Sequence, residues 1–179
     1  MMTWRALLSL HRASAVAYSK AVSSVLLVAA GCSCVDYGVP GEPHERLNAA
    51  LHRAARDGDA SLVQTLVGKG ADVNAVDLDG HYTDTALMIV CRYGHRDVAR
   101  LLLASDADPN RQEGVDEGNP TPLMIAARRG DAELTQMLLD AGADVNAVNK
   151  PGDTALSNAR WNGDEPTIEL LLRAGALEN

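Results

Sequence analysis

Aromatic residues are scarce in this sequence: it contains no phenylalanine, and tyrosine and tryptophan together make up 3% of the 179 residues. Its core must therefore be built from Ala, Leu, Val and Ile, which favours helices packed through small side chains. Cysteine is scarce as well, and three cysteines are too few for a fold held together by disulfides. The apolar run from Ala21 to Ala30 has about half the length that a membrane-spanning helix needs.

Basic residues are also in deficit. The sequence has 16 Lys and Arg against 24 Asp and Glu, which gives a formal net charge of −8. Residues 1–31 contain three of the basic residues and no acidic one, so the rest of the chain is more acidic still. An acidic surface repels phosphate backbones, and the composition therefore argues against a nucleic-acid partner.

The first 31 residues have the pattern of an export signal. Arg5, Arg12 and Lys20 precede the apolar run, and the run ends in Ala29-Ala30-Gly31-Cys32. This ending resembles a bacterial lipobox, which implies cleavage before Cys32 and lipid modification of its thiol and freed amine. The resemblance predicts an exported protein, held by Cys32 at a membrane in the bacterial periplasm or cell envelope.

Three other interpretations of this segment stay open. Cleavage after Ala30 would release a soluble secreted protein, and an acid-free, Arg-containing N-terminus also suits a mitochondrial transit peptide. Alternatively, Cys32 and Cys34 are an unmodified pair. Residues 32–46 contain Pro40, Pro43 and two glycines, and we expect a flexible linker there.

The rest of the chain repeats itself with intervals of 36, 36 and 33 residues. Three residue types recur in one register: a glycine, a leucine and an asparagine. The positions are Gly58, Gly94, Gly130 and Gly163; Leu51, Leu87, Leu123 and Leu156; and Asn74, Asn110, Asn146 and Asn179.

Each unit has the pattern of two short helices. The first helices are expected at 50–56, 86–92, 122–128 and 155–161, and a glycine that can adopt left-handed geometry follows each of them. Asp59, Asp131 and Asp164 come directly after that glycine and are predicted to cap the second helices. Asp106 takes the place of the glycine that ends the other second helices.

These units resemble ankyrin repeats. The segment from Thr121 to Ala127, followed by Gly130 and by Gly142-Ala143-Asp144-Val145-Asn146-Ala147, is close to the consensus of that family. The resemblance implies an all-α solenoid of stacked helix–turn–helix pairs with projecting β-turn fingers, over residues 47–179. The expected repeats are 47–76, 77–112, 113–148 and 149–179.

The sequence departs from the family pattern at two features. The histidine of the family motif survives only as His52, so the usual Thr–His contact is absent from all four units. Two fingers, Asn74–Thr85 and Asn110–Thr121, are three residues longer than the finger Asn146–Thr154. Longer loops cost little entropy, so these insertions are candidates for a binding role.

No arrangement of residues predicts catalysis, a metal site or a cofactor. Cys91 occupies a core alanine column and is expected to be a buried, unreactive thiol. Asp77, Asp79 and Asp84 faintly resemble a calcium loop, but Met88 stands where such a loop closes with glutamate. A small-molecule or calcium-dependent site in the fingers 77–84 and 111–120 is the alternative function.

The resemblance implies that a partner is held by the fingers and by the exposed end of each first helix, a surface here called the palm. Arg, Tyr and Trp, which dominate binding hot spots, recur at the palm positions, whereas the fingers are acidic. The candidate partner-binding residues are Arg56, Arg92, Tyr93, Arg128, Arg129 and Trp161 on the palm, and Asp79, Tyr82, Asp84, Asp116 and Glu117 on the fingers.

The sequence thus predicts a monomeric, non-catalytic protein that binds another, folded protein. Its partner would be an enzyme that it stabilises or a toxin that it blocks. Two less specific interpretations remain: Tyr93 and Trp161 only cover the end of the stack, and the acidic finger tips only keep the protein soluble.

Overall fold

The computed structural model describes residues 43–77, 83–112 and 118–177. Within them the secondary structure is helical, and the only β pairing is a single antiparallel bridge between Val76 and Thr85. The helices are α3 (Pro43–Asp57), α4 (Ala60–Gly68), α5 (Ala86–Tyr93), α6 (Arg96–Leu103), α7 (Pro122–Arg129), α8 (Ala132–Asp140), α9 (Ala155–Asn162) and α10 (Glu165–Arg173). This architecture confirms the predicted all-α solenoid.

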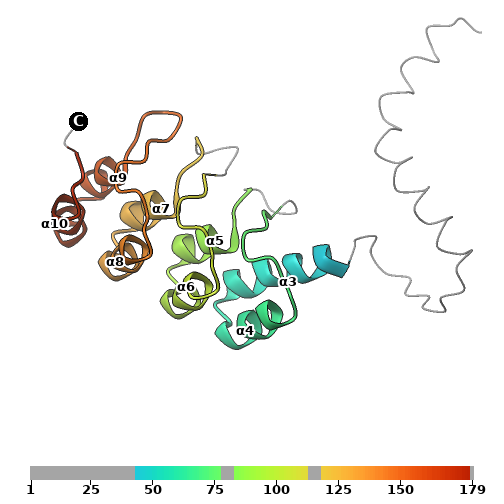
Figure 1. The fold of residues 1–179 in the computed structure, drawn as a ribbon. Coiled ribbons are helices and arrows are strands. Elements are labelled where there is room, and N and C mark those ends of the chain that lie inside the picture. Colours follow the sequence, from blue (N-terminus) through green and yellow to red (C-terminus); the bar gives the residue numbers. More distant parts are fainter. Residues whose placement is uncertain (1–42, 78–82, 113–117, 178–179) are drawn as a thin grey trace, which may run out of the picture. The chain divides into compact units, whose positions relative to one another are not determined.

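The helices form four pairs that stack side by side in two layers (Figure 1). The inner layer consists of α3, α5, α7 and α9, in which each helix packs on the next, and the outer layer of α4, α6, α8 and α10. The loops that join one pair to the next project together on the side of the inner layer.

The leucine column forms the centre of the inner layer. Leu51, Leu87, Leu123 and Leu156 are each 2% exposed or less. Cys91 is fully buried beside them, as expected, and this burial raises the pKa of its thiol. A thiol that stays protonated and out of solvent is a packing residue rather than a nucleophile.

Side-chain caps fix where the helices begin. Asp59, Asp131 and Asp164 accept hydrogen bonds from the backbone N–H groups three residues later, at 2.9, 3.0 and 3.1 Å, and so confirm the predicted caps. Thr85, Thr121 and Thr154 cap α5, α7 and α9 in the same way. The first inner helix differs from the expectation: α3 begins at Pro43, inside the segment predicted as linker. Proline is tolerated there because the first turn of a helix needs no backbone donor.

Gly94 shows why the glycine column is needed. It ends α5 with a φ of +81°, and a Cβ atom at this position would lie 2.6 Å from the guanidinium group of Arg129 in the next repeat. The glycine therefore ends its own helix and also makes room for a side chain of the neighbouring one.

Candidate functional site

Two aromatic side chains are exposed at the ends of inner helices. Trp161, on α9, is 85% exposed, and Tyr93, on α5, is 48% exposed. The ring of Tyr93 stacks on His95 with a centroid separation of 6.1 Å, and Nε2 of His95 lies 3.0 Å from the carbonyl oxygen of Arg56. Tyr93 is thus held in place by the structure, whereas the Trp161 side chain is almost fully available to a partner.

The palm arginines have different environments. Arg56 forms an ion pair of 3.1 Å with Asp77, and Arg129 donates a hydrogen bond of 3.1 Å to the carbonyl oxygen of Arg92 in the preceding repeat. Arg56, Arg128 and Arg129 are nevertheless exposed at the surface. Arg129 and Arg56 therefore also serve the stack itself.

Asp84 and Arg92 differ most from the sequence-based expectation. Asp84 was expected on an exposed finger, but it is 3% exposed and pairs with Arg92 at 3.1 Å. Nε of Arg92 donates to one carboxylate oxygen and the terminal nitrogen reaches both. The pair forms because the finger returns to its own repeat, where the Asp77 N–H donates to the carbonyl of Asp84. Both side chains therefore stabilise the finger base and are poorly placed to contact a partner.

Four of the candidate residues, Asp79, Tyr82, Asp116 and Glu117, lie outside the described residues. The calcium alternative rests largely on the same segments. Within the parts that are described, no group of three or more His, Cys, Asp or Glu side chains is arranged to hold a metal ion. Asp77 and Asp84, the described acids of the first long finger, pair with arginines instead.

A groove lies between the third finger and the inner helices α7 and α9. Its volume is about 440 Å³, and a narrower recess of about 40 Å³ adjoins it along Pro120, Met124 and Ile125. A backbone hydrogen bond joins this finger to the preceding one, because the Lys150 N–H donates to the carbonyl oxygen of Gly118 at 2.8 Å. The groove is lined by Arg128, Asp153, Ser157, Asn158 and Trp161.

The asparagine column is evident in the sequence, but its role becomes clear only in the structure. The Asn74 side chain donates to the Asp106 carbonyl and accepts from the Asp108 N–H of the next repeat. Asn110 and Asn146 make the same pair of bonds one repeat further on, the former to Gly142 and Asp144. Each amide thus uses its donor and its acceptor to join two repeats. The sign of this role in the sequence was a polar residue that recurs at the same loop position in each repeat.

Asn110→Ala should lower the free energy of unfolding by about 1.5 kcal/mol, because it removes two hydrogen bonds between the central repeats. Urea unfolding followed by circular dichroism measures this change. Gln136→Ala is the matched control, since the Gln136 amide bonds to Asp140 on its own helix and joins no repeats. Equal losses of unfolding free energy in the two variants would show that the asparagine hydrogen bonds do not couple the repeats.

A comparison with protein families agrees with the observed stack of helix pairs. A model described as ankyrin repeats (3 copies) matches residues 10–113 and 113–179. The chain belongs to the ankyrin repeat family. A comparison with individually curated proteins finds no match. Proteins of this family are generally protein–protein interaction modules and are typically non-catalytic.

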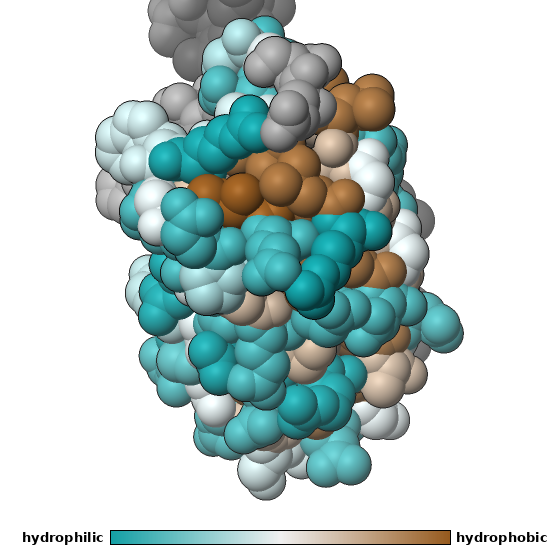
Figure 2. Space-filling view, turned by 90° about the vertical axis from the view of Figure 1, so that its left-hand side faces the viewer, coloured by the Kyte–Doolittle hydropathy of each residue, from teal (hydrophilic) through white to brown (hydrophobic). Residues whose placement is uncertain are grey.

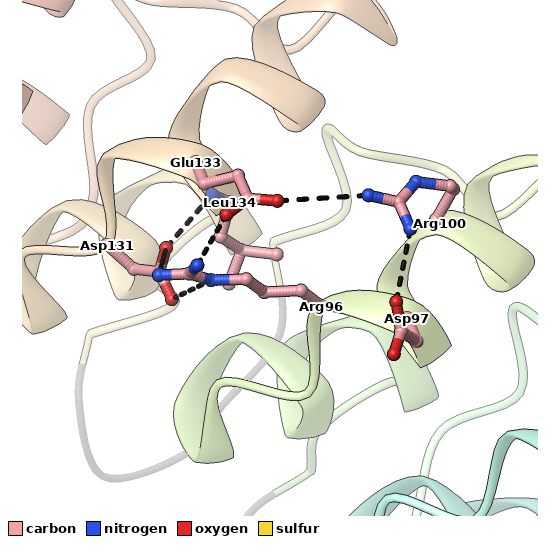
Figure 3. Close-up of polar contacts among 6 residues, drawn as sticks. All are labelled: Arg96, Asp97, Arg100, Asp131, Glu133 and Leu134. Atoms are coloured by element: carbon pink, nitrogen blue, oxygen red, sulfur yellow. Dashed lines mark hydrogen bonds and ion pairs between the residues drawn. The ribbon is translucent and has the colours of Figure 1, made fainter.

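The outer layer of the ankyrin stack carries ion pairs between repeats (Figure 3). Arg96 on α6 contacts Asp131 at 2.9 Å and also Glu133, and these carboxylates, chiefly Asp131, raise the pKa of Arg96. Arg100 contacts Glu133 at 3.8 Å and Asp97 at 3.1 Å. Asp131 is buried, whereas the two pairs of Arg100 are exposed and add little stability. In both cases the charged groups satisfy one another. The outer layer is therefore a weaker candidate for docking than the palm.

The last ankyrin repeat also exposes apolar surface at the C-terminal end of the stack. Figure 2 faces this end and shows an apolar patch bordered by hydrophilic residues. Leu172 and Leu177 are 39% and 63% exposed. They belong to the last helix pair and the turn after it, and no further pair follows within the described residues.

Proposed function

We propose that this ankyrin repeat protein is a non-catalytic binding module that holds a folded partner protein on its palm. The observation that carries the proposal is the 85% exposure of Trp161 beside a groove of about 440 Å³. An exposed indole next to a concave, partly charged surface is typical of binding hot spots. A rigid surface also loses little conformational entropy when a partner binds.

The palm positions suited to this role are Tyr93, Arg128 and Trp161. All three are exposed on inner helices, and Arg128 and Trp161 share the groove. Arg92 is excluded from the test because its pair with Asp84 contributes to folding. The triple substitution of Tyr93, Arg128 and Trp161 by Ala therefore probes the exposed surface and leaves the pair between Asp84 and Arg92 intact.

The triple variant should lose affinity for the partner by at least about 30-fold, since hot-spot side chains contribute ~2 kcal/mol or more when buried in an interface. The partner is first captured with the wild-type protein from the native membrane fraction, and binding of the purified pair is then measured by calorimetry. Circular dichroism should show unchanged helical content.

A control variant replaces Gln136, Glu169 and Arg173 by Ala on the outer helices α8 and α10, where all three side chains are exposed. It should bind the partner as the wild type does. If the control loses affinity while the palm variant keeps it, the docking face is the outer layer and the proposal is wrong.

We further propose export and anchoring through Cys32. The support is the basic lead-in, the apolar run and the sequence Ala29-Ala30-Gly31-Cys32. Residues 1–42 lie outside the described residues, and among the described helices none is long and apolar enough to cross a bilayer. Intact-mass measurement of the mature protein tests the proposal: a lipid-modified chain that starts at Cys32 supports it, and an unprocessed chain contradicts it. A tethered ankyrin protein would then either stabilise an enzyme of the envelope or block a toxin. Identification of the captured partner distinguishes these two roles.

A further inference from the structure

The ion pair between Asp84 and Arg92 provides a template for the inner face of each repeat. The aspartate precedes the threonine that caps α5, and the arginine comes eight residues later, in the last turn of the same helix. The guanidinium reaches the carboxylate through two nitrogen atoms, at distances of 3.1 to 3.4 Å. This position of the repeat can thus hold an arginine side chain against an aspartate.

The fourth repeat keeps the aspartate but not the arginine. Asp153 precedes the cap Thr154 as Asp84 precedes Thr85, and the residue eight positions later is Trp161. Asp153 is exposed, and among the described residues it forms no ion pair; its carboxylate accepts one long hydrogen bond, of 3.3 Å, from Asn149. The carboxylate and the indole line the same groove.

The other polar groups of the groove wall near Asp153 are already used. The Ser157 hydroxyl accepts from the Thr154 N–H and donates to the Thr154 carbonyl oxygen, and the Asn158 amide donates to that same oxygen. The Asp153 backbone is fixed as well, because its N–H donates to Asn149 Oδ1 at 2.7 Å. The Asp153 carboxylate is therefore the acceptor that this rigid wall presents to a guest.

We propose that the groove takes an arginine side chain of the partner protein, which lies on Trp161 and pairs with Asp153 as Arg92 pairs with Asp84. The inference rests on the proposed function, because it names the partner group that the palm recognises. A planar guanidinium stacks on an indole and matches a carboxylate with two donors, whereas lysine offers only a point charge. The net charge of −8 favours the approach of a cationic group.

Arg128 sets the orientation of the guest. It lines the same groove as Asp153, so the groove wall carries charges of both signs. The guest cation is repelled by Arg128 and lies against Asp153 and Trp161.

The test uses the full-length chain and two blocked amino acids, N-acetyl-arginine methylamide and its neutral analogue N-acetyl-citrulline methylamide. The indole N–H signal of Trp161 is followed in a proton–nitrogen correlation spectrum and is distinguished from that of Trp4 with the Trp161→Phe variant. The arginine probe should shift the Trp161 signal in a saturable way, and the citrulline probe should not. Asp153→Asn should weaken the arginine response by about five-fold, as expected for an exposed charge pair.

Glu169→Gln, which removes an exposed acid from α10, is the control and should respond as the wild type does. Equal shifts with both probes, no shift at all, or an unchanged response in Asp153→Asn would each overturn the inference. The proposed function is tested separately by partner capture. If the Asp153→Asn variant binds the captured partner normally while the triple variant of Tyr93, Arg128 and Trp161 does not, that result would mean that the palm binds the partner without recognising an arginine side chain.

Discussion

Replacing Arg92 with methionine should lower the free energy of unfolding by about 3 kcal/mol, because the change removes the guanidinium that pairs with a buried carboxylate. The carboxylate belongs to Asp84, whose side chain is 4% exposed, whereas the Arg92 side chain is 20% exposed. Methionine keeps most of the aliphatic length of arginine, so the loss reports the charge rather than a cavity. Urea unfolding followed by circular dichroism measures it.

The double variant Asp84→Asn with Arg92→Met separates this effect from packing. Neutralising both partners removes the buried carboxylate charge as well, so the double variant should regain about 2 kcal/mol of the loss. If the two single losses simply add, the carboxylate is not coupled to the arginine. The pair would then be a contact of the surface rather than a support of the finger base.

Leu123→Ala should lower the free energy of unfolding by about 3–4 kcal/mol, through lost burial and the cavity left behind. Leu123 is fully buried in α7, the inner helix that packs on both α5 and α9. In a stack where repeats contact only their neighbours, a weak central repeat uncouples the two halves. Unfolding should therefore become less cooperative, and its midpoint should move to a lower urea concentration.

The matched control is Leu156→Ala, at the same column in the last helix pair. Leu156 is 2% exposed, so the lost burial is nearly equal. Because α9 belongs to the last described pair, the expected result is local opening of α9 and α10, with a smaller change in the main transition. Hydrogen exchange locates the opening. Equal global losses in the two variants would contradict the solenoid account of stability.

Much of the fold was predictable from sequence because its elements depend on local signals. The helix expected at 86–92 is observed at Ala86–Tyr93, and the caps Asp59, Asp131 and Asp164 form as predicted. Asp106, expected to replace a glycine, does adopt a positive φ of 63°. Repeated columns give both the ends of each helix and the face that it buries.

The candidate site was less predictable, because it depends on how the fingers return to the helices. The spacing of Asp84 gave no sign that it would be buried against Arg92. The same contact, lost in the fourth repeat, leaves Asp153 exposed beside Trp161. Aligning the repeats in the sequence compares equivalent positions of different repeats. The contacts of Asp84 and Asp153 join different positions within one repeat, so the alignment does not reveal them.

Hydrogen–deuterium exchange of the protein with and without its captured partner tests the central claim most directly. Binding on the palm should slow exchange at the ends of α5, α7 and α9 and in the third finger around Asp153. Exchange in the outer helices α4, α6, α8 and α10 should remain unchanged. Protection confined to the outer helices would contradict a partner-binding palm.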